Sequence, residues 1–169
     1  MLLERLGIKT DLSSKEYVEN FERYRITKFR SWNIPLLTSL LGDYGITGKD
    51  VFLNDHRSNL DFVEDLPFGY SQIWVMGKRK KLDEYEQPIK VGSPYQTLAR
   101  NFFERRNYLT IINPIELKKI EGSWEGLVEL GLVDVVVDCK VNGRTSTANG
   151  LKLLEKVLDS NAILLKRGL

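Results

Sequence analysis

The chain has 169 residues, which is enough for one sizeable core or two small lobes. Its 42% hydrophobic and 28% charged residues are ordinary for a globular protein, and a net charge of +2 gives no reason to expect a nucleic-acid or membrane partner. The single Cys139 excludes an intramolecular disulfide, and the single His56 argues against a histidine metal centre or catalytic triad. No apolar run reaches the length of a membrane span and no signal peptide is evident, so we expect a cytoplasmic protein.

Apolar spacing, β-branched runs and capping residues predict helices and strands that alternate along the chain. In the first half we expect a helix end over 2–6, a strand over 24–29, a helix over 34–41, a glycine-punctuated strand and loop over 42–50, and a strand over 71–76. In the second half we expect strands over 89–93, 109–112 and 161–165, helices over 95–107 and 124–130, and a helical or mixed segment over 150–158. This alternation predicts an α/β protein whose sheets are mixed and mainly parallel.

A charged segment over 78–87 divides the chain and predicts two lobes with a cleft between them. We expect lobe 1 over 1–77, lobe 2 over 88–150, and a C-terminal segment over 151–169 that returns to pack on both. The segment contains the one dense basic run, 78–81, but acidic residues follow at once, so it indicates a solvated loop rather than a nucleic-acid surface.

Residues 131–147 carry the strongest functional signal. The β-branched run over 135–137 has no polar alternation, which is typical of a strand covered on both faces. Asp134 and Asp138 flank this run, and residues 142–147, Asn-Gly-Arg-Thr-Ser-Thr, follow it. Residues of these types cap helices and expose backbone amides, and the start of a helix attracts anions. The pattern therefore predicts a phosphate site at the end of a buried strand.

The same pattern has a second interpretation. Strand–turn–helix units often carry Gly and Thr for the turn and cap alone, and an Asp after a strand is often only a loop residue. The two carboxylates favour a ligand, because a sugar phosphate needs acceptors for its hydroxyls beside donors for its phosphate. Phosphoribosyl diphosphate is a ligand of this kind.

Several segments, read in order, resemble the catalytic domain of the ATP phosphoribosyltransferases, the first enzymes of histidine biosynthesis. The residues that carry the resemblance are D-Y-G-I-T-G-K-D at 43–50, the helix entry at 91–103 with Tyr95, Ala99, Arg100 and Phe102, E-G-S-W-E at 121–125, G-L-V-D-V-V-V-D at 131–138, and G-R-T-S-T-A-N-G-L at 143–151. Together they cover most of the chain from about Phe29 onward.

The resemblance implies a two-lobed fold like that of the type II periplasmic-binding proteins. It also implies transfer of the phosphoribosyl group from phosphoribosyl diphosphate to N1 of ATP, with release of pyrophosphate and with Mg²⁺ present. The expected partners are these two substrates, further copies of the chain, and a regulatory subunit resembling histidyl-tRNA synthetase. No nucleic acid or membrane is implied.

The resemblance also implies two groups of site residues. The group expected to bind phosphoribosyl diphosphate comprises Asp134, Asp138, Asn142, Gly143, Arg144, Thr145 and Ser146. The group expected on the nucleotide or pyrophosphate side comprises Gly45, Thr47, Gly48, Lys49, Glu121 and Ser123. Several of these residues also have a purely structural interpretation. The glycines could serve ordinary turns, and Lys49 could be a solvated surface lysine. Glu121 and Ser123 could belong to a turn and helix cap. Asp138 is the one side chain considered as a metal ligand.

The sequence also departs from the family pattern. Family members begin with a strand and a K-G-R-L segment, and the sequence given starts with Met1-Leu2-Leu3-Glu4, so we expect this part of the pyrophosphate contact to be missing. Ser146 replaces the usual Leu, and Asn33 stands where Asp is typical. A non-catalytic paralogue that still binds a nucleotide or sugar phosphate is the alternative, and a solute-binding domain is a third.

Overall fold

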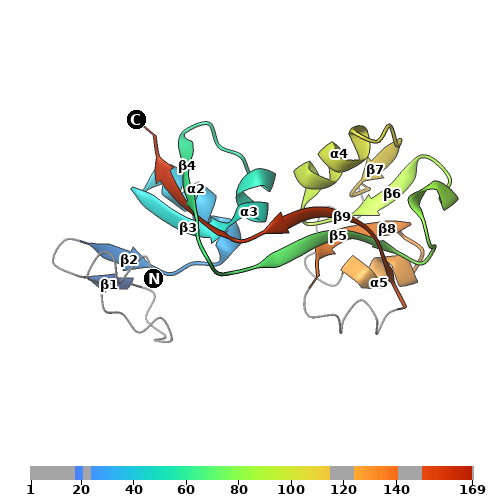
Figure 1. Cartoon of the computed structure of the whole chain (residues 1–169), viewed down its shortest axis with the longest axis horizontal. Helices are drawn as coiled ribbons and strands as arrows, with labels where there is room; N and C mark the ends of the chain where they lie inside the picture. Colours follow the sequence, from blue (N-terminus) through green and yellow to red (C-terminus); the bar gives the residue numbers. More distant parts are fainter. Residues whose placement is uncertain (1–17, 21–23, 115–123, 141–149, 169) are drawn as a thin grey trace.

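The computed structural model describes residues 18–20, 24–114, 124–140 and 150–168, and Figure 1 shows two lobes side by side. A three-stranded sheet forms the centre of lobe 1 and a five-stranded sheet the centre of lobe 2. This arrangement confirms the expected two-lobed α/β fold.

Lobe 1 is an antiparallel sheet of order β3-β10-β4 with helices packed on it. Its elements are η1 (Ser31–Asn33), α2 (Ile34–Leu40), β3 (Tyr44–Gly48), α3 (Lys49–Asn54), β4 (Leu60–Asp65) and β10 (Ala162–Arg167). Pro35 lies in the first turn of α2, where its missing N–H costs no helical hydrogen bond. Ile163 and Leu165 on the central strand are completely buried and pack with Phe52 of α3 and Leu60.

Lobe 2 is a sheet of order β7-β6-β8-β5-β9 with a helix on each face. Its elements are β5 (Ser71–Gly77), η2 (Leu82–Glu84), β6 (Ile89–Gly92), α4 (Gln96–Glu104), β7 (Thr110–Ile112), α5 (Trp124–Glu129), β8 (Val135–Cys139) and β9 (Lys152–Ser160). Val135 and Val137 belong to the core beneath α4, with Phe103, whereas Val136 belongs to the core beneath α5, with Trp124. The valine run is thus buried on both faces, as predicted.

Several predicted elements differ from the structure. Residues 150–158 mostly form the strand β9 rather than a helix, because pairing with β5 outweighs an apolar spacing that suits a helix. Two strands were not expected. They are β4 and β1 (Val18–Asn20), and β1 pairs antiparallel with β2 (Arg25–Thr27). The expected helix end at 2–6 lies outside the described residues.

The mixed character of the sheets is confirmed, but the expected majority of parallel pairs is not. Only β6–β7 and β6–β8 are parallel among the seven strand pairings of the described residues, and the other five are antiparallel. Apolar periodicity reports which face of a strand is buried and carries no information about the direction of its neighbour.

The lobes also divide at a different place from the expected boundary at residue 77. Strand β5 belongs to the five-stranded sheet, so the chain leaves lobe 1 after Asp65 and enters lobe 2 at Ser71. It returns between β9 and β10, so the C-terminal segment supplies one strand to each sheet. The charged segment at 78–87 is therefore a connection within lobe 2.

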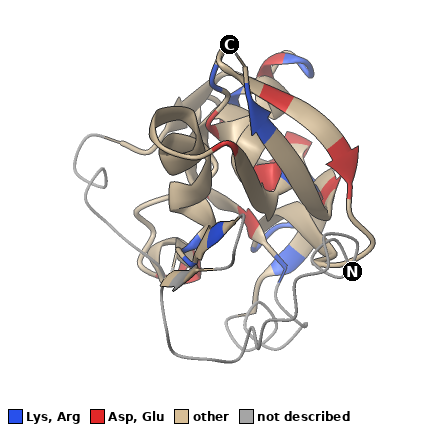
Figure 2. Ribbon diagram, turned by 90° about the vertical axis from the view of Figure 1, so that its left-hand side faces the viewer, with Lys and Arg blue, Asp and Glu red and all other residues tan. Residues whose placement is uncertain are grey.

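Basic and acidic positions are interspersed along the described segments, as the ribbon in Figure 2 shows. Lys78, the residue after β5, pairs with Glu129 at 2.9 Å. No helix of the described part is long and apolar enough to cross a membrane.

Candidate functional site

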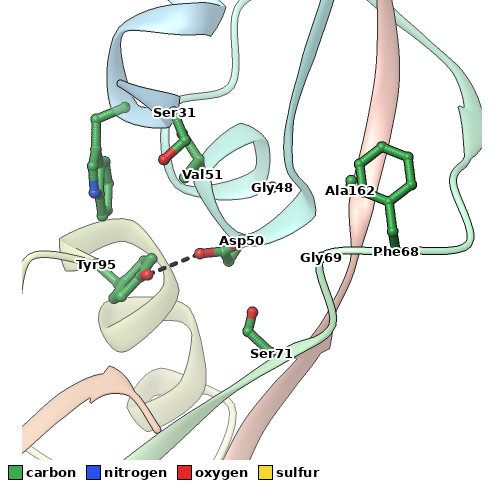
Figure 3. Close-up of a pocket in the computed structure, with 10 residues that line it drawn as sticks. Ser31, Gly48, Asp50, Val51, Phe68, Gly69, Ser71, Tyr95 and Ala162 are labelled. Carbon is green, nitrogen blue, oxygen red and sulfur yellow. Dashed lines mark hydrogen bonds between the residues drawn. The ribbon is translucent and has the colours of Figure 1, made fainter. Parts of the chain in front are cut away.

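A pocket of about 270 Å³ lies where the two lobes meet. Figure 3 shows side chains from both lobes converging on it. Its lining consists of Ser31, Trp32, Gly48, Asp50, Val51, Phe68, Gly69, Ser71, Tyr95 and Ala162. These residues come from η1, the start of α3, the connection at 66–70, the first residues of β5 and β10, and the residue before α4. A pocket between two lobes with a few buried polar groups is the usual form of a small-molecule site.

Asp50 is the buried acid of this pocket, and only 7% of it is exposed. One carboxylate oxygen accepts the hydroxyl of Tyr95 at 2.8 Å, and the other accepts the hydroxyl of Ser160 at 2.6 Å. The Asp50 amide donates to the same Ser160 oxygen at 3.0 Å. Burial and the neighbouring Asp50 charge raise the pKa of Tyr95, so the tyrosine remains a proton donor in this contact.

Tyr95 is held from the lobe 2 side by buried hydrogen bonds. Its amide donates to the Ser93 hydroxyl at 2.8 Å, and that hydroxyl donates to the Val137 carbonyl of β8 at 2.6 Å. The Asn113 side chain exchanges two hydrogen bonds of 2.7 Å with the Ser93 backbone. The Tyr95 ring also contacts the Trp32 ring of lobe 1 at a centroid distance of 4.9 Å.

The carboxyl end of β8, where the sequence predicts a ligand site, lies near this pocket. The Lys140 amide donates to the Gln72 carbonyl at 2.8 Å, next to the pocket residue Ser71. Asp138 is paired with Trp74 and so lies on the α5 side of the sheet, at the same edge as the pocket. Burial, with a smaller contribution from Glu125, raises the pKa of Asp138 to about 6.

The structure does not bring Asp134 and Asp138 together. They are four positions apart along an extended strand, which is a span of roughly 13 Å. Asp134 precedes β8 at its other end, where its carboxylate accepts the Lys90 amide at 2.8 Å and its amide donates to the Lys90 carbonyl at 2.8 Å. Asp134 therefore braces β8 against β6.

The predicted nucleotide-side residues have different surroundings. Of the four that the structure describes, Gly48 lines the pocket. The Thr47 hydroxyl is buried and donates to the Ser31 carbonyl at 2.9 Å. A Cβ on Gly45 would overlap the Thr38 side chain, so glycine lets α2 approach the sheet. Lys49 pairs with Asp65 at 3.3 Å on the lobe 1 side of the connection.

The remaining predicted residues lie outside the described part of the chain. They are Glu121, Ser123, Asn142, Gly143, Arg144, Thr145 and Ser146. Sequence reasoning assigned no role to Asp50, Tyr95, Trp32 or Ser160. Asp50 and Tyr95 belong to two of the motifs quoted above, and their place in these motifs was the one sequence signal that could have pointed to them as site residues.

A comparison with known protein families shows to which family the chain belongs. The family model described as ATP phosphoribosyltransferase matches residues 35–168. The chain belongs to this family. The ATP phosphoribosyltransferase of Dictyoglomus thermophilum is 32% identical over 145 residues, which are 85% of this chain and 67% of that protein.

Two solved structures, one of an ATP phosphoribosyl transferase complex and one of a ligand-binding protein, share the fold. The ATP phosphoribosyl transferase (HisG:HisZ) complex from Thermotoga maritima matches 98% of this chain and 79% of that chain, with a TM-score of 0.77 and 22% identity. A ligand-binding component of an ABC-type import system from Staphylococcus aureus matches 79% of this chain and 51% of that chain, with a TM-score of 0.50 and 16% identity. The latter likeness agrees with the expected periplasmic-binding-protein-like architecture.

Proposed function

We infer that the chain transfers the phosphoribosyl group of phosphoribosyl diphosphate to N1 of ATP, giving phosphoribosyl-ATP and pyrophosphate. The observation that carries the inference is the family match, which spans β8, the residues after it, and nearly the whole lining of the inter-lobe pocket. The inferred reaction is the first step of histidine biosynthesis.

We assign the two substrates to different parts of the junction. Asp138, at the carboxyl end of β8, supplies acceptors for the ribose hydroxyls, and residues 142–146 bind the 5-phosphate. Gly48 and Lys49, at the start of α3, face the nucleotide or pyrophosphate, with Gly45 and Thr47 behind them, and Glu121 and Ser123 belong to the same side.

The reaction requires little acid–base catalysis by side chains of the protein. Pyrophosphate is a good leaving group, and the transition state carries positive charge on the ribose. Holding the two substrates in line and stabilising the departing diphosphate supplies most of the rate. A pocket with a buried acid and a tyrosine locked as a donor, and without a histidine in its lining, suits that task.

Mg²⁺ fits this site as an ion that arrives with the substrate. Within the described ranges no three His, Cys, Asp or Glu residues gather into a metal site. Mg²⁺ commonly binds through substrate phosphates and one or two carboxylates, and Asp138 is the carboxylate we assign to it. When bound, the ion neutralises the charge of the diphosphate.

We also propose that the chain assembles with a second kind of subunit. The support is the Thermotoga maritima neighbour, which was solved as a HisG:HisZ complex. Size-exclusion chromatography with multi-angle light scattering, with and without such a subunit, measures the assembly directly.

The function is tested by incubating the chain with ATP, phosphoribosyl diphosphate and MgCl₂ and following phosphoribosyl-ATP by absorbance. We expect product from the wild type, and Asp138→Ala should raise the KM for phosphoribosyl diphosphate by about tenfold or more, in line with the loss of a charge-assisted contact. Asp134→Asn is the matched control, because it keeps an acceptor for the Lys90 amide and lies at the far end of β8. Equal effects of the two variants would contradict the assignment of Asp138, and no product from the wild type would contradict the function.

A further inference from the structure

The two lobes are joined by two narrow connections, residues 66–70 and Asn161. These connections lie side by side, since the Leu66 amide donates to the Ala162 carbonyl at 2.8 Å and the Ala162 amide donates to the Phe68 carbonyl at 2.9 Å. Gly69 has a φ of +70°, and a Cβ there would come within 3.2 Å of the Ala162 Cβ. Two short adjacent connections of this kind are typical of a hinge between lobes.

Away from these connections, the lobes meet through the Trp32–Tyr95 ring contact and through α3 of lobe 1 and α4 of lobe 2 with its N-cap Tyr95. The Asn54 side-chain oxygen accepts the amides of Thr97 and Leu98 at 3.0 and 3.4 Å. The N-cap residue of α4 itself, Tyr95, makes no side-chain cap hydrogen bond. A residue of one lobe therefore satisfies the helix start of the other.

The second contact between these helices is the hydrogen bond from Tyr95 to Asp50 in the pocket (Figure 3). Asp50 is tied at the same time to Ser160, the last residue of β9 before the connection. Its carboxylate thus links the hinge to the start of α4. If the lobes separated, the Tyr95 contact would break while the Ser160 contact stayed within reach, because α3 and Ser160 adjoin the hinge.

We propose that Tyr95 and Asp50 form a latch that sets the separation of the two lobes at which the pocket is assembled. Tyr95 is then a positioning residue for the reaction rather than a catalytic one, and Asn54 supports it from the same helix as Asp50. The kinetic part of this proposal rests on the proposed function. Removing the Tyr95 hydroxyl leaves a buried carboxylate oxygen without its donor, which disfavours the closed arrangement relative to an open one where water reaches Asp50.

Three variants test the latch. Tyr95→Phe removes only the hydroxyl, and Asn54→Ala removes the cap from outside the pocket lining. Tyr85→Phe is the matched control, because the Tyr85 hydroxyl accepts the Arg79 amide at 2.9 Å within lobe 2. Melting temperatures verify that each variant is folded. If Tyr95→Phe does not fold, Asn54→Ala still tests the latch.

Small-angle X-ray scattering without ligand should give a larger radius of gyration for Tyr95→Phe and Asn54→Ala than for the wild type and Tyr85→Phe. Saturating substrates should return both variants to the wild-type curve. In steady-state assays, both should raise the KM for both substrates roughly five- to tenfold while kcat stays within about twofold, since a less populated binding-competent state lowers apparent affinity.

Wild-type scattering and wild-type KM values for both variants would overturn the latch. A fall in kcat alone for Tyr95→Phe would also overturn it, because that result assigns the hydroxyl to the chemical step. If the wild type makes no phosphoribosyl-ATP, the proposed function fails, while the ligand-free scattering of the variants still decides the latch.

Discussion

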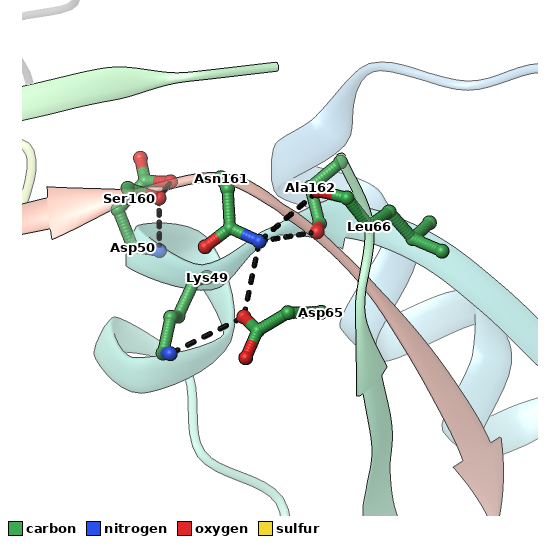
Figure 4. A network of polar contacts seen from close by, with 7 residues as sticks. All are labelled: Lys49, Asp50, Asp65, Leu66, Ser160, Asn161 and Ala162. Atoms are coloured by element: carbon green, nitrogen blue, oxygen red, sulfur yellow. Dashed lines mark hydrogen bonds and ion pairs between the residues drawn. The ribbon is translucent and has the colours of Figure 1, made fainter. Parts of the chain in front are cut away.

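The side-chain amide of Asn161 donates to the Asp65 carboxylate at 3.0 Å and ties the start of β10 to the end of β4 (Figure 4). The same amide donates to the carbonyls of Leu66 and Ala162 at 3.2 and 2.9 Å. One side chain therefore fastens both connections between the lobes. The hydrogen bond from Asn161 to Asp65 is also the main reason why the pKa of Asp65 lies below its ordinary 3.8.

Replacing Asn161 should weaken the protein at the hinge. We expect Asn161→Ala to lower the free energy of unfolding by about 1 kcal/mol, the usual loss for such hydrogen bonds, as measured by urea denaturation. The pKa of Asp65, followed by NMR, should rise toward 3.8 in the variant. Asn59→Ala is the control, since its side chain makes one exposed hydrogen bond to the Ser39 carbonyl. An unchanged Asp65 pKa would contradict this account.

Asp138 should make stability depend on pH. Its folded-state pKa of about 6 lies above the ordinary 3.8, so the native state favours the protonated acid. Stability from this group is fully present below pH 3.8 and is lost as the pH rises through about 6. Asp138→Asn should therefore gain stability relative to the wild type between these values, by about 3 kcal/mol at neutral pH, and the gain should then level off.

This prediction is measured by denaturant unfolding of both proteins between pH 4 and pH 8. Asparagine retains an oxygen that accepts the Cys139 amide, which the Asp138 carboxylate now accepts at 2.7 Å. The comparison therefore isolates the charge. A difference in stability that is constant across the pH range would contradict the burial of this acid.

Gly45 and Gly126 should respond oppositely to alanine. A Cβ at Gly45 would overlap Thr38 and crowd Ile34, so Gly45→Ala should destabilise lobe 1 by about 1–3 kcal/mol through overpacking. A Cβ at Gly126, within α5, would meet nothing within 4 Å, so Gly126→Ala should be neutral or stabilising by up to about 1 kcal/mol. Thermal denaturation of both variants measures the contrast, and equal losses would show that packing under α2 is not the reason for Gly45.

The sequence predicts the parts of this fold that depend on local pattern. The valine run over 135–137 reveals a strand with helices on both faces, and Pro35 marks the start of α2. Strand β9 was missed because its leucines and valine follow a spacing that also suits a helix, and the pairing with β5 decides between the two.

The candidate site could be predicted only where its residues follow one strand. Asp138 was assigned to the site from its place at the carboxyl end of a predicted strand, and that role stays a proposal. Asp134 was grouped with it but contacts Lys90 at the other end of the strand. Asp50 lies 45 residues from Tyr95 and 110 from Ser160, so their contacts arise from the assembly of two lobes. No local pattern encodes a contact of that kind.

The position of β10 has a consequence for the order in which the chain folds. It is the central strand of the lobe 1 sheet, and β3 and β4 do not pair with each other. Four strands of lobe 2, in contrast, are paired without β9 or β10. During synthesis, lobe 2 can therefore build most of its sheet while lobe 1 waits until β10 has left the ribosome, and the apolar face of lobe 1 stays open to chaperones until then.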